Sequence, residues 1–342
     1  MKLFEPERVF FDPDALKYPL GQKLYKRFLG TETDVLQLSP QNAARNIPGK
    51  TEKEKYVQSK RTLYVTVKKA TRLDVCKPSA DYEFSLVSNC PGNCEYCYLQ
   101  TTQGSKPYLK VFANLEDIFG TIRHYLDSRP GETTTFEVAS LGDPLGLEHL
   151  TGSLAETVNF FGGLENARLR IVTKYDNVGT LLDAKHNGHT RFRFSINARY
   201  VIQNFEHNTA SLDERLAAAS KIAAAGYPMG FVVAPIMVFE GWKEQYEELF
   251  AGLKKSLYGI GSTEPVTFEL IQHRFTAVAK SHILQRFPNT RLDLDEEKRS
   301  LKWGRFGRYK YVYPRETAKE IREFTEKLIL ENIPNAQIEY FT

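Results

Sequence analysis

Three of the four cysteines in the chain, Cys90, Cys94 and Cys97, fall within eight residues and follow the spacing C-x3-C-x2-C. Thiolates are soft ligands that suit iron–sulfur clusters and zinc. A structural zinc ion usually takes four protein ligands, whereas three cysteines on one loop fill three corners of a four-iron cluster and leave one iron open. A catalytic metal centre requires such an open position, so the spacing predicts a catalytic iron–sulfur cluster.

Two other interpretations of these cysteines are a zinc knuckle completed by a histidine, and small residues that are simply buried. No histidine lies within 25 residues after Cys97, because the next one is His124, and this argues against a local knuckle. In a cytosolic chain of this size, clustered cysteines also indicate metal or redox chemistry more than a disulfide framework.

Alternating strand-like and helix-like segments after residue 80 must position this loop. We predict strands at 82–87, 134–139, 169–173, 191–196, 230–234 and 266–270. We predict helices at 115–128, 152–161, 178–185, 211–225, 242–255 and 276–287. Such repeats are typical of a parallel α/β sheet with helices outside, which right-handed crossovers can curl into all or part of a barrel. Chemistry in these barrels lies at the C-terminal ends of the strands, and the cysteines follow the first strand.

The rest of the chain suggests three parts within a single compact unit. Residues 1–79 are mixed and polar, with one strand-like segment at 61–69, and are interpreted as an irregular N-terminal extension. Residues 80–287 form the predicted barrel. Residues 288–342 contain a basic and aromatic stretch, followed by a predicted closing helix at 318–332 and a last strand at 337–341.

The overall composition is that of an ordinary globular protein, with 342 residues, 42% of them hydrophobic, and a formal charge of +4. No run of 18 or more apolar residues occurs, so no membrane span is expected. The first residues lack the apolar core of a signal peptide. We therefore expect a cytoplasmic protein, and we expect it to be a monomer.

The cysteine spacing, with aromatic Tyr96 before the third cysteine, resembles the signature of radical S-adenosylmethionine enzymes. Longer blocks resemble one family among them, spore photoproduct lyase. The blocks include CEYCYLQTTQGSKPY at 94–108 and FELIQHRF at 268–275, with further ones at 181–188, 190–197, 302–305 and 339–342. The resemblance extends from about residue 10 to the end of the chain.

This resemblance implies a partial (β/α)6 TIM-like barrel of the radical S-adenosylmethionine type, with an N-terminal extension and a C-terminal DNA-binding hairpin. It implies a [4Fe–4S] cluster on the three cysteines and S-adenosylmethionine on the fourth iron, which together generate a 5′-deoxyadenosyl radical. That radical removes a hydrogen from C6 of spore photoproduct, 5-thyminyl-5,6-dihydrothymine. The dimer then fragments, a protein thiol quenches the product radical, and two thymines are restored. The implied activity is that of a carbon–carbon lyase in DNA repair.

The resemblance also implies roles for residues at the predicted strand ends. Lys174 is expected to neutralise the carboxylate of S-adenosylmethionine, and Ser195 and Asn197 are expected to contact its ribose and carboxylate. Ala234 would offer backbone atoms to the adenosyl group, and Tyr96 would contact the adenine. The plain alternative is that these are solvated rim residues or packing residues.

The sequence departs from this family at the radical quencher. The family has a thiol donor just after the second strand, in a Cys-Thr-Ser-Asp segment, and the matching segment here is Ser140-Leu-Gly-Asp143. A serine O–H bond is too strong to give its hydrogen to a carbon radical. The remaining cysteine, Cys76, stands where the family more usually has serine, so we hypothesise that Cys76 is the donor. Tyr98 is expected near the path between cofactor and lesion.

Several alternatives to this hypothesis stay open. Cys76 could be a small buried residue, which is the commoner fate of a free cysteine. Ser140 could be an engineered substitution, although Leu141 and Gly142 also differ from the family segment. The chain could also act on another lesion. A packing role beneath the cysteine loop is the alternative for Tyr98.

A stretch near the C-terminus carries the features of a nucleic-acid surface. Residues 298–311, KRSLKWGRFGRYKY, contain six basic residues, four aromatic residues and no acidic residue, and two glycines permit a hairpin turn. Basic side chains bind phosphates with salt-dependent affinity, and a wedge can fill the space left by an extruded base. We therefore expect Lys302, Trp303, Arg305 and Arg308 to bind DNA. The alternative is a solvated basic loop.

Three classes of function follow from these features. The first is a lyase that repairs spore photoproduct in DNA, with an electron donor such as ferredoxin or flavodoxin as partner, in the spore core or the germinating cell. The second is a radical S-adenosylmethionine enzyme that acts on a different DNA lesion or nucleic-acid substrate. The third is a non-enzymatic DNA-binding protein with an iron–sulfur cluster or zinc.

Overall fold

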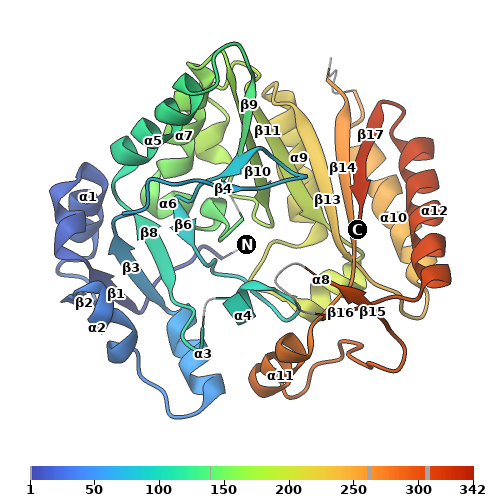
Figure 1. The fold of residues 1–342 in the computed structure, drawn as a ribbon, viewed down its shortest axis with the longest axis horizontal. Helices are drawn as coiled ribbons and strands as arrows, with labels where there is room; N and C mark the ends of the chain where they lie inside the picture. Colours follow the sequence, from blue (N-terminus) through green and yellow to red (C-terminus); the bar gives the residue numbers. More distant parts are fainter. Residues whose placement is uncertain (1, 103, 139, 260–263, 305–308) are drawn as a thin grey trace.

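A curled sheet of mostly parallel strands forms the centre of the molecule (Figure 1). The computed structural model describes every residue except 1, 103, 139, 260–263 and 305–308. Within the described residues the sheet has the order β17-β14-β13-β11-β10-β9-β5-β4, and only the β4–β5 pair is antiparallel. The strands are β4 (Asp74–Val75), β5 (Tyr82–Glu83), β9 (Thr134–Glu137), β10 (Ala167–Thr173), β11 (Thr190–Ile196), β13 (Met229–Ile236), β14 (Val266–Gln272) and β17 (Ala336–Phe341).

Helices cover the outer side of this sheet (Figure 1). Helix α7 packs on β10, α9 on β11, and α12 on β14 and β17. The helices between the strands are α5 (Leu115–Asp127), α6 (Glu148–Thr151), α7 (Ser153–Gly162), α8 (Arg199–Phe205), α9 (Leu212–Ala224), α10 (Trp242–Ser256) and α11 (Ala277–Arg286), and α12 (Arg315–Asn332) follows them. Helix α9 begins with a capping box in which Ser211 and Glu214 bind each other's backbone N–H groups.

Strand β11 illustrates how the sequence separates the two faces of the sheet. Phe192 and Phe194 are fully buried in the hydrophobic core, whereas the intervening Arg193 forms ion pairs with Glu137 of β9 and Glu269 of β14. Successive side chains of a strand point to opposite faces. The barrel interior is therefore polar, and the apolar core lies between the sheet and the helices.

The fold class and most predicted elements are confirmed, with shifts of a few residues at the boundaries. The single strand predicted at 82–87 is wrong, because the segment divides between two sheets as β5 and β6 (Val87–Ser88). Phe84 N still bonds to Glu137 O of β9 at 3.0 Å, but Leu86 O already accepts from Phe112 N at 3.0 Å. The backbone therefore changes its partner strand within three residues.

The helix predicted at 178–185 is also wrong, because only a short 3-10 turn forms there, at Gly179–Leu181. The end of the segment is held as a loop by α7. Asn159 Oδ1 accepts from Lys185 N at 2.7 Å, and a Cβ on Gly162 would come within 1.8 Å of Lys185 O. This close approach of two backbones fixes the segment against α7 and leaves no room for a further helical turn.

Residues 1–79 are more regular than the sequence suggested. They contribute β1 (Arg8–Phe11), β2 (Asp34–Gln37) and β3 (Thr62–Thr66), which confirms the strand expected near residues 61–69, and also α1 (Pro19–Phe28), α2 (Pro40–Ala43) and α3 (Glu52–Lys60). These strands share a second sheet, in the order β2-β1-β3-β8-β6, with β6 and with β8 (Leu109–Phe112) from beyond residue 79. The division of the chain at residues 79 and 287 stays a prediction.

The C-terminal region adds a hairpin and closes the large sheet. Strands β15 (Ser300–Trp303) and β16 (Tyr309–Val312) pair antiparallel, with Trp303 opposite Tyr309. Helix α12 and strand β17 confirm the predicted closing helix and last strand, and β17 lies parallel to β14. Among the described residues, no helix has both the length and the apolar character needed to cross a membrane.

Candidate active site

The cysteine loop follows β6 and is held from two sides. Its short strand β7 (Asn93–Cys94) pairs antiparallel with β12 (Glu206–His207), and Cys94 lies opposite Glu206. On the other side, Lys60 Nζ at the end of α3 donates to Cys90 O at 2.7 Å and to Gly92 O at 2.8 Å. A short helix, α4 (Leu99–Thr102), follows the loop. The loop is therefore fixed before any ligand binds.

The loop brings its three thiols to one small cavity, which Cys90, Cys94 and Cys97 line together. Gly92 packs closely there, because a Cβ at this position would lie 3.0 Å from Thr209 Cγ2 and 3.2 Å from Tyr175 OH, so these side chains would have to shift. Burial raises the pKa of the Cys90 thiol to about 11, although the Lys60 ammonium opposes the rise. Three soft thiols around one cavity fit a cluster that binds by replacing their protons. No group of three His, Cys, Asp or Glu side chains in the described part of the chain is arranged to hold a single metal ion.

Lys174 and Tyr96 come together near Cys94, where the Lys174 charge opposes the rise that burial causes in the pKa of the Cys94 thiol. Lys174 Nζ donates to Tyr96 OH at 2.9 Å and to Glu206 Oε1 at 2.7 Å, and it lies 5.4 Å from the centre of the Tyr96 ring. The Tyr96 hydroxyl also donates to Glu206. The lysine that the sequence assigned to a cofactor carboxylate therefore already faces one carboxylate of the protein.

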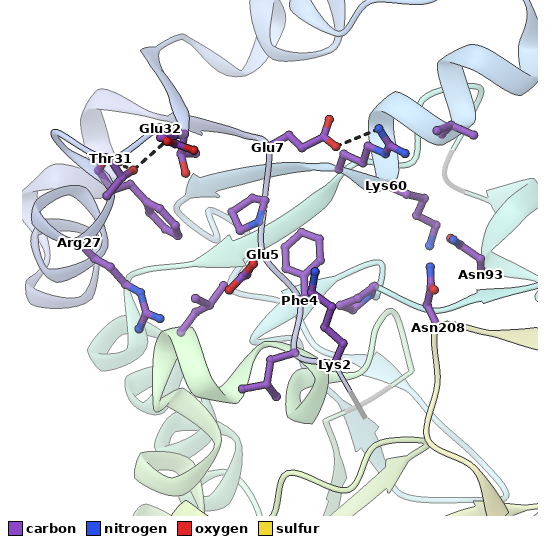
Figure 2. A pocket seen from close by; sticks show the side chains of 18 of the residues that line it. Lys2, Phe4, Glu5, Glu7, Arg27, Thr31, Glu32, Lys60, Asn93 and Asn208 are labelled. Carbon is purple, nitrogen blue, oxygen red and sulfur yellow. Dashed lines mark hydrogen bonds and ion pairs between the residues drawn. The ribbon is translucent and has the colours of Figure 1, made fainter.

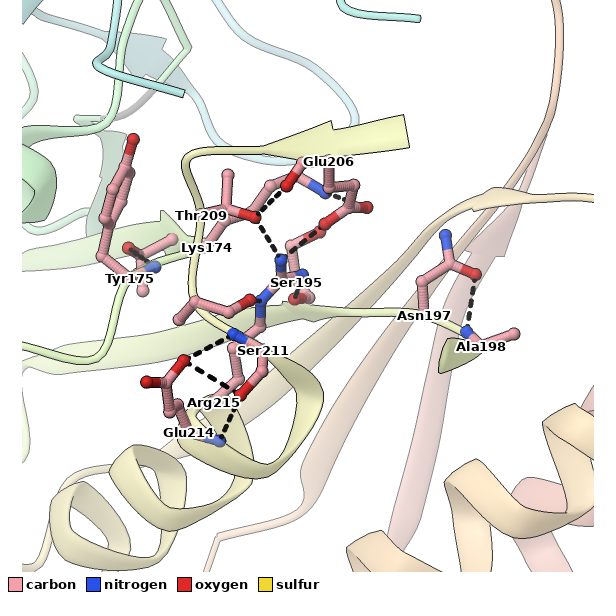
Figure 3. A network of polar contacts seen from close by, with 12 residues as sticks. Lys174, Tyr175, Ser195, Asn197, Ala198, Glu206, Thr209, Ser211, Glu214 and Arg215 are labelled. Carbon is pink, nitrogen blue, oxygen red and sulfur yellow. Dashed lines mark hydrogen bonds and ion pairs between the residues drawn. The ribbon is translucent and has the colours of Figure 1, made fainter. Parts of the chain in front are cut away.

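Glu206 is a residue of this site that the sequence did not reveal. It is buried, and besides Lys174 it accepts from Arg215 Nη2 of α9 at 2.6 Å (Figure 3). Burial alone would raise the pKa of Glu206, but the charges of Arg215 and Lys174 outweigh it and lower the pKa to about 2. Glu206 belongs to no recognised sequence motif. The one signal in the sequence is Arg215, a charged residue on the apolar face of α9, because a buried arginine needs a carboxylate partner.

The other predicted cofactor residues occupy the ends of β11 and β13. Ser195 is buried, and its carbonyl oxygen accepts from Arg215 Nη1 at 2.9 Å. Asn197 is fully buried, and its side chain donates to Pro235 O at 2.7 Å and accepts from Tyr246 OH at 2.8 Å. Ala234, next to Pro235, is half-buried. The Asn197 side chain is thus engaged with protein groups, and the cofactor roles of these residues stay predictions.

Tyr98 contacts Ser140, and its hydroxyl lies within the electrostatic influence of the Cys76 thiol. The Tyr98 hydroxyl donates to Ser140 O, while Ser140 Oγ is buried and has no hydrogen-bond partner among the described residues. Although Tyr98 is 57% exposed, partial desolvation raises the pKa of its hydroxyl, and the thiols of Cys97 and Cys76 contribute to this rise. The Tyr98 phenol therefore lies near both the cysteine loop and the remaining cysteine.

Cys76 lies between β4 and β5 in a setting that keeps its thiol protonated. Burial raises the pKa of Cys76 to about 12, and the carboxylates of Glu137 and Glu83 add to the rise. The thiol also forms a hydrogen bond to Glu83. A hydrogen-atom donor must retain its S–H bond, so this environment suits that role better than the role of a nucleophilic thiolate.

The hairpin of β15 and β16 presents part of the predicted DNA surface. Trp303 and Tyr309 are 64% and 55% exposed, and their rings meet edge to face at 4.9 Å between centroids. Lys302 is also exposed. Arg299 points inward, 3.9 Å from the centre of the Tyr313 ring, so it is not part of the exposed surface. Arg305 and Arg308 lie outside the described residues.

A larger cavity of about 1090 Å³ lies next to the cysteine loop and is lined in part by the N-terminal segment (Figure 2). Pro91 and Asn93 of the loop reach its wall, but none of the predicted site residues does. Its charges have both signs, and Arg61 Nη1 pairs with Glu7 Oε1 at 2.9 Å. Size alone therefore does not identify the active site of this molecule.

The curled parallel sheet and the loop of three cysteines define a partial barrel of the radical S-adenosylmethionine type. A model of the spore photoproduct lyase family matches residues 4–342. The chain belongs to the spore photoproduct lyase family. Spore photoproduct lyase of Geobacillus sp. (strain Y412MC61) is 51% identical over 342 residues and all of both chains. That of Bacillus subtilis (strain 168) is 48% identical over 339 residues, 99% of each chain.

A solved structure of spore photoproduct lyase covers all of this chain and all of its own, with a TM-score of 0.96 and 52% identity. It is a double mutant, in which a cysteine is replaced by alanine and a serine by cysteine, with bound AdoMet and dinucleoside spore photoproduct. These comparisons confirm the family and the fold that the sequence predicted. They do not test the roles of single residues.

Proposed function

We propose that the chain is a DNA repair lyase that reverts spore photoproduct to two thymines, using a [4Fe–4S] cluster and S-adenosylmethionine. The observation that carries this proposal is the solved relative, which matches this fold over its whole length and binds AdoMet and dinucleoside spore photoproduct. The cavity lined by three thiols, with the Lys174 charge acting on one of them, Cys94, supports a matching site in this chain.

Some residues of the site bind the cluster, and others bind and orient the cofactor. Cys90, Cys94 and Cys97 hold the cluster, and the bound cluster and cofactor supply a 5′-deoxyadenosyl radical. Lys174 meets the carboxylate of the cofactor, and Glu206 holds that ammonium in place by accepting its hydrogen bond at 2.7 Å. Tyr96 presents its ring to the adenine from the same loop.

Cys76 ends the reaction by giving its hydrogen atom to the product radical. In this step the S–H bond of Cys76 breaks, a C–H bond forms on the thymine, and a thiyl radical stays on sulfur. The double mutant among the solved relatives loses a cysteine at position 140 and gains one at position 76. This chain likewise has a cysteine at position 76 and none at position 140, where it has serine instead of the mutant's alanine. Tyr98, whose pKa is raised in part by the Cys76 thiol, is the proposed neighbour of this thiol near the path of the reaction.

A reconstitution experiment tests the function as a whole. We expect the anaerobically reconstituted protein, given S-adenosylmethionine, a reductant and dinucleoside spore photoproduct, to form 5′-deoxyadenosine and the dinucleotide with two thymines. A protein that forms no 5′-deoxyadenosine would instead belong to the non-enzymatic class. Formation of 5′-deoxyadenosine without thymine release, from this dinucleotide and from a lesion-containing duplex, would favour a different substrate.

The raised pKa of Cys76 predicts a clean reaction over a wide pH range. The thiol is an acid whose pKa rises to about 12 in the folded protein, so it keeps its proton where an ordinary thiol, with a pKa of about 8.5, has lost it. We expect the fraction of consumed lesion that is recovered as two thymines to stay constant between about pH 7 and about pH 10. Chromatographic product analysis measures this fraction. A decline centred near pH 8.5 would contradict the protected thiol.

The hairpin of β15 and β16 is proposed to bind the damaged duplex through Lys302, Trp303, Arg305 and Arg308. We expect affinity for a lesion-containing duplex to fall steeply with salt. Trp303→Ala should weaken this binding by about 1–3 kcal/mol, because stacking on a base is lost. Fluorescence anisotropy at two salt concentrations measures both effects. Tyr258→Ala removes another aromatic side chain, which is 88% exposed, and serves as the control. Equal losses in the two variants would contradict a specific role for the hairpin.

The oligomeric state, the location and the electron donor of the enzyme are proposed from its family membership. We expect the enzyme to work as a monomer in the cytoplasm, in the spore core or the germinating cell. Ferredoxin or flavodoxin is the proposed class of electron donor, because the cluster must be reduced one electron at a time.

A further inference from the structure

The buried Arg193 and the partly buried Arg170 hold the turn that carries Cys76. Residues 76–81 connect β4 to β5, and the turn reaches the polar interior of the barrel at Ser79. Arg170 Nη1 donates to Ser79 O at 2.7 Å, and Arg193 Nη1 donates to Ser79 Oγ at 2.9 Å. The Ser79 hydroxyl in turn donates to Glu137 Oε2 at 3.2 Å. One serine hydroxyl thus bridges a buried cation and a buried carboxylate.

The groups that hold Ser79 are themselves fixed by several strands. Arg193 of β11 pairs with Glu137 of β9 and with Glu269 of β14. Arg170 of β10 donates to Glu269 Oε1 at 2.8 Å and to Glu339 Oε2 of β17 at 2.5 Å. Because each cation has a carboxylate partner in the barrel wall, the network forms a rigid support for the turn.

Backbone hydrogen bonds within the turn connect Cys76 to the residues that follow Ser79. Ala80 N donates to Cys76 O at 3.1 Å, and Cys76 N donates to Asp81 O at 3.3 Å. The Asp81 carboxylate is fixed to the sheet by Thr135 N at 2.9 Å. Because these hydrogen bonds join the neighbours of Ser79 to Cys76, we expect a displacement at Ser79 to shift the Cys76 backbone and its thiol.

We propose that Ser79 is a positioning residue for the hydrogen transfer from Cys76. Its hydroxyl, held between Arg193 and Glu137, sets the place of the thiol and so decides how much product radical is quenched before it reacts otherwise. Transfer between two groups is sensitive to displacements of about 1 Å, whereas the radical is generated elsewhere in the barrel. This inference rests on the proposed donor role of Cys76.

The test compares Ser79→Ala, Ser79→Thr, Cys76→Ala and the double variant Cys76→Ala/Ser79→Ala at equal iron content, with dinucleoside spore photoproduct as substrate. We expect Ser79→Ala to form 5′-deoxyadenosine within about twofold of the wild-type rate. The clean fraction, which is the fraction of consumed lesion recovered as two thymines, should fall severalfold. Ser79→Thr keeps the hydroxyl and should restore most of that fraction. The double variant should be no worse than Cys76→Ala, because Ser79 acts through the thiol.

The outcomes distinguish the positioning role of Ser79 from the donor role of Cys76. An unchanged clean fraction in Cys76→Ala would overturn the donor role itself. If Cys76→Ala lowers the fraction but Ser79→Ala does not, only the positioning role of Ser79 is overturned. A further loss in the double variant would also overturn it, since Ser79 would then act independently of the thiol.

Discussion

Replacing Cys76 by alanine is expected to leave the formation of 5′-deoxyadenosine intact and to lower the yield of two thymines sharply. The cysteine loop, Lys174 and Glu206 are untouched by this change, so 5′-deoxyadenosine should still form within about twofold of the wild-type rate. The yield of two thymines should fall at least about tenfold, because each 1.4 kcal/mol lost from the quenching step costs a factor of ten relative to competing reactions. Quantifying both products and any radical adducts in one reaction measures the effect.

A second cysteine variant controls for the place of the thiol. Cys76→Ala/Ser140→Cys returns a thiol to the end of β9, where the family resemblance places the donor, and should recover much of the clean yield. Ser140→Cys alone should change little, because the wild-type chain already has a donor. A clean yield that survives in Cys76→Ala would show that Cys76 is a buried bystander, and the donor hypothesis would be lost.

Glu206→Gln is expected to destabilise the folded protein strongly. The substitution leaves Arg215, whose side chain is completely buried, without its carboxylate partner. Removing one partner of a buried ion pair costs about 3–5 kcal/mol, since the other charge stays buried and uncompensated. Denaturant unfolding at neutral pH measures this loss. We also expect poorer cluster loading, because Glu206 lies opposite Cys94 in the β7–β12 pair.

The pH dependence of unfolding gives an independent check on Glu206. Its pKa is about 2 in the folded protein, below the ordinary value of 4.5, so its ionised form stabilises the fold at neutral pH. That contribution, about 3 kcal/mol, is lost as pH falls from about 4 to about 2. Glu206→Gln should lack this part of the acid destabilisation. Asp213→Asn is the matched control, because it breaks an exposed pair with Arg199 and should cost at most about 1 kcal/mol. Similar losses in both variants would refute the special role of the buried pair.

The sequence predicted those features of the fold that depend on local pattern. Alternation and apolar runs located β10, β11, β13 and β14 because these strands are long and flanked by clear helices. The division of 82–87 into β5 and β6 could not be predicted in this way, since a continuous run looks the same whether its backbone bonds to one sheet or to two. Likewise, the loop at 178–185 depends on contacts with Asn159 and Gly162, which are distant in sequence.

The candidate site shows the same division between local and distant information. Cysteine spacing predicted the cluster loop, and the family resemblance predicted the role of Lys174, because both signals lie within short segments. Glu206 could not be identified, because its role depends on the pairing of β12 with β7 and on Arg215 reaching it from α9. The missing thiol at Ser140 was visible in the sequence, but the convergence of Cys76 with Tyr98 required the folded chain.

The contact between Lys60 and the cysteine loop bears on how this protein can be shortened or recombined. A version trimmed to the barrel would lose α3, and the carbonyl groups of Cys90 and Gly92 would lose the ammonium that binds them. It would also lose β3 and so expose the edge of β8, which invites aggregation. The N-terminal region therefore forms part of the wall around the proposed cluster site, and chimeras within the family should exchange it together with the loop that it supports.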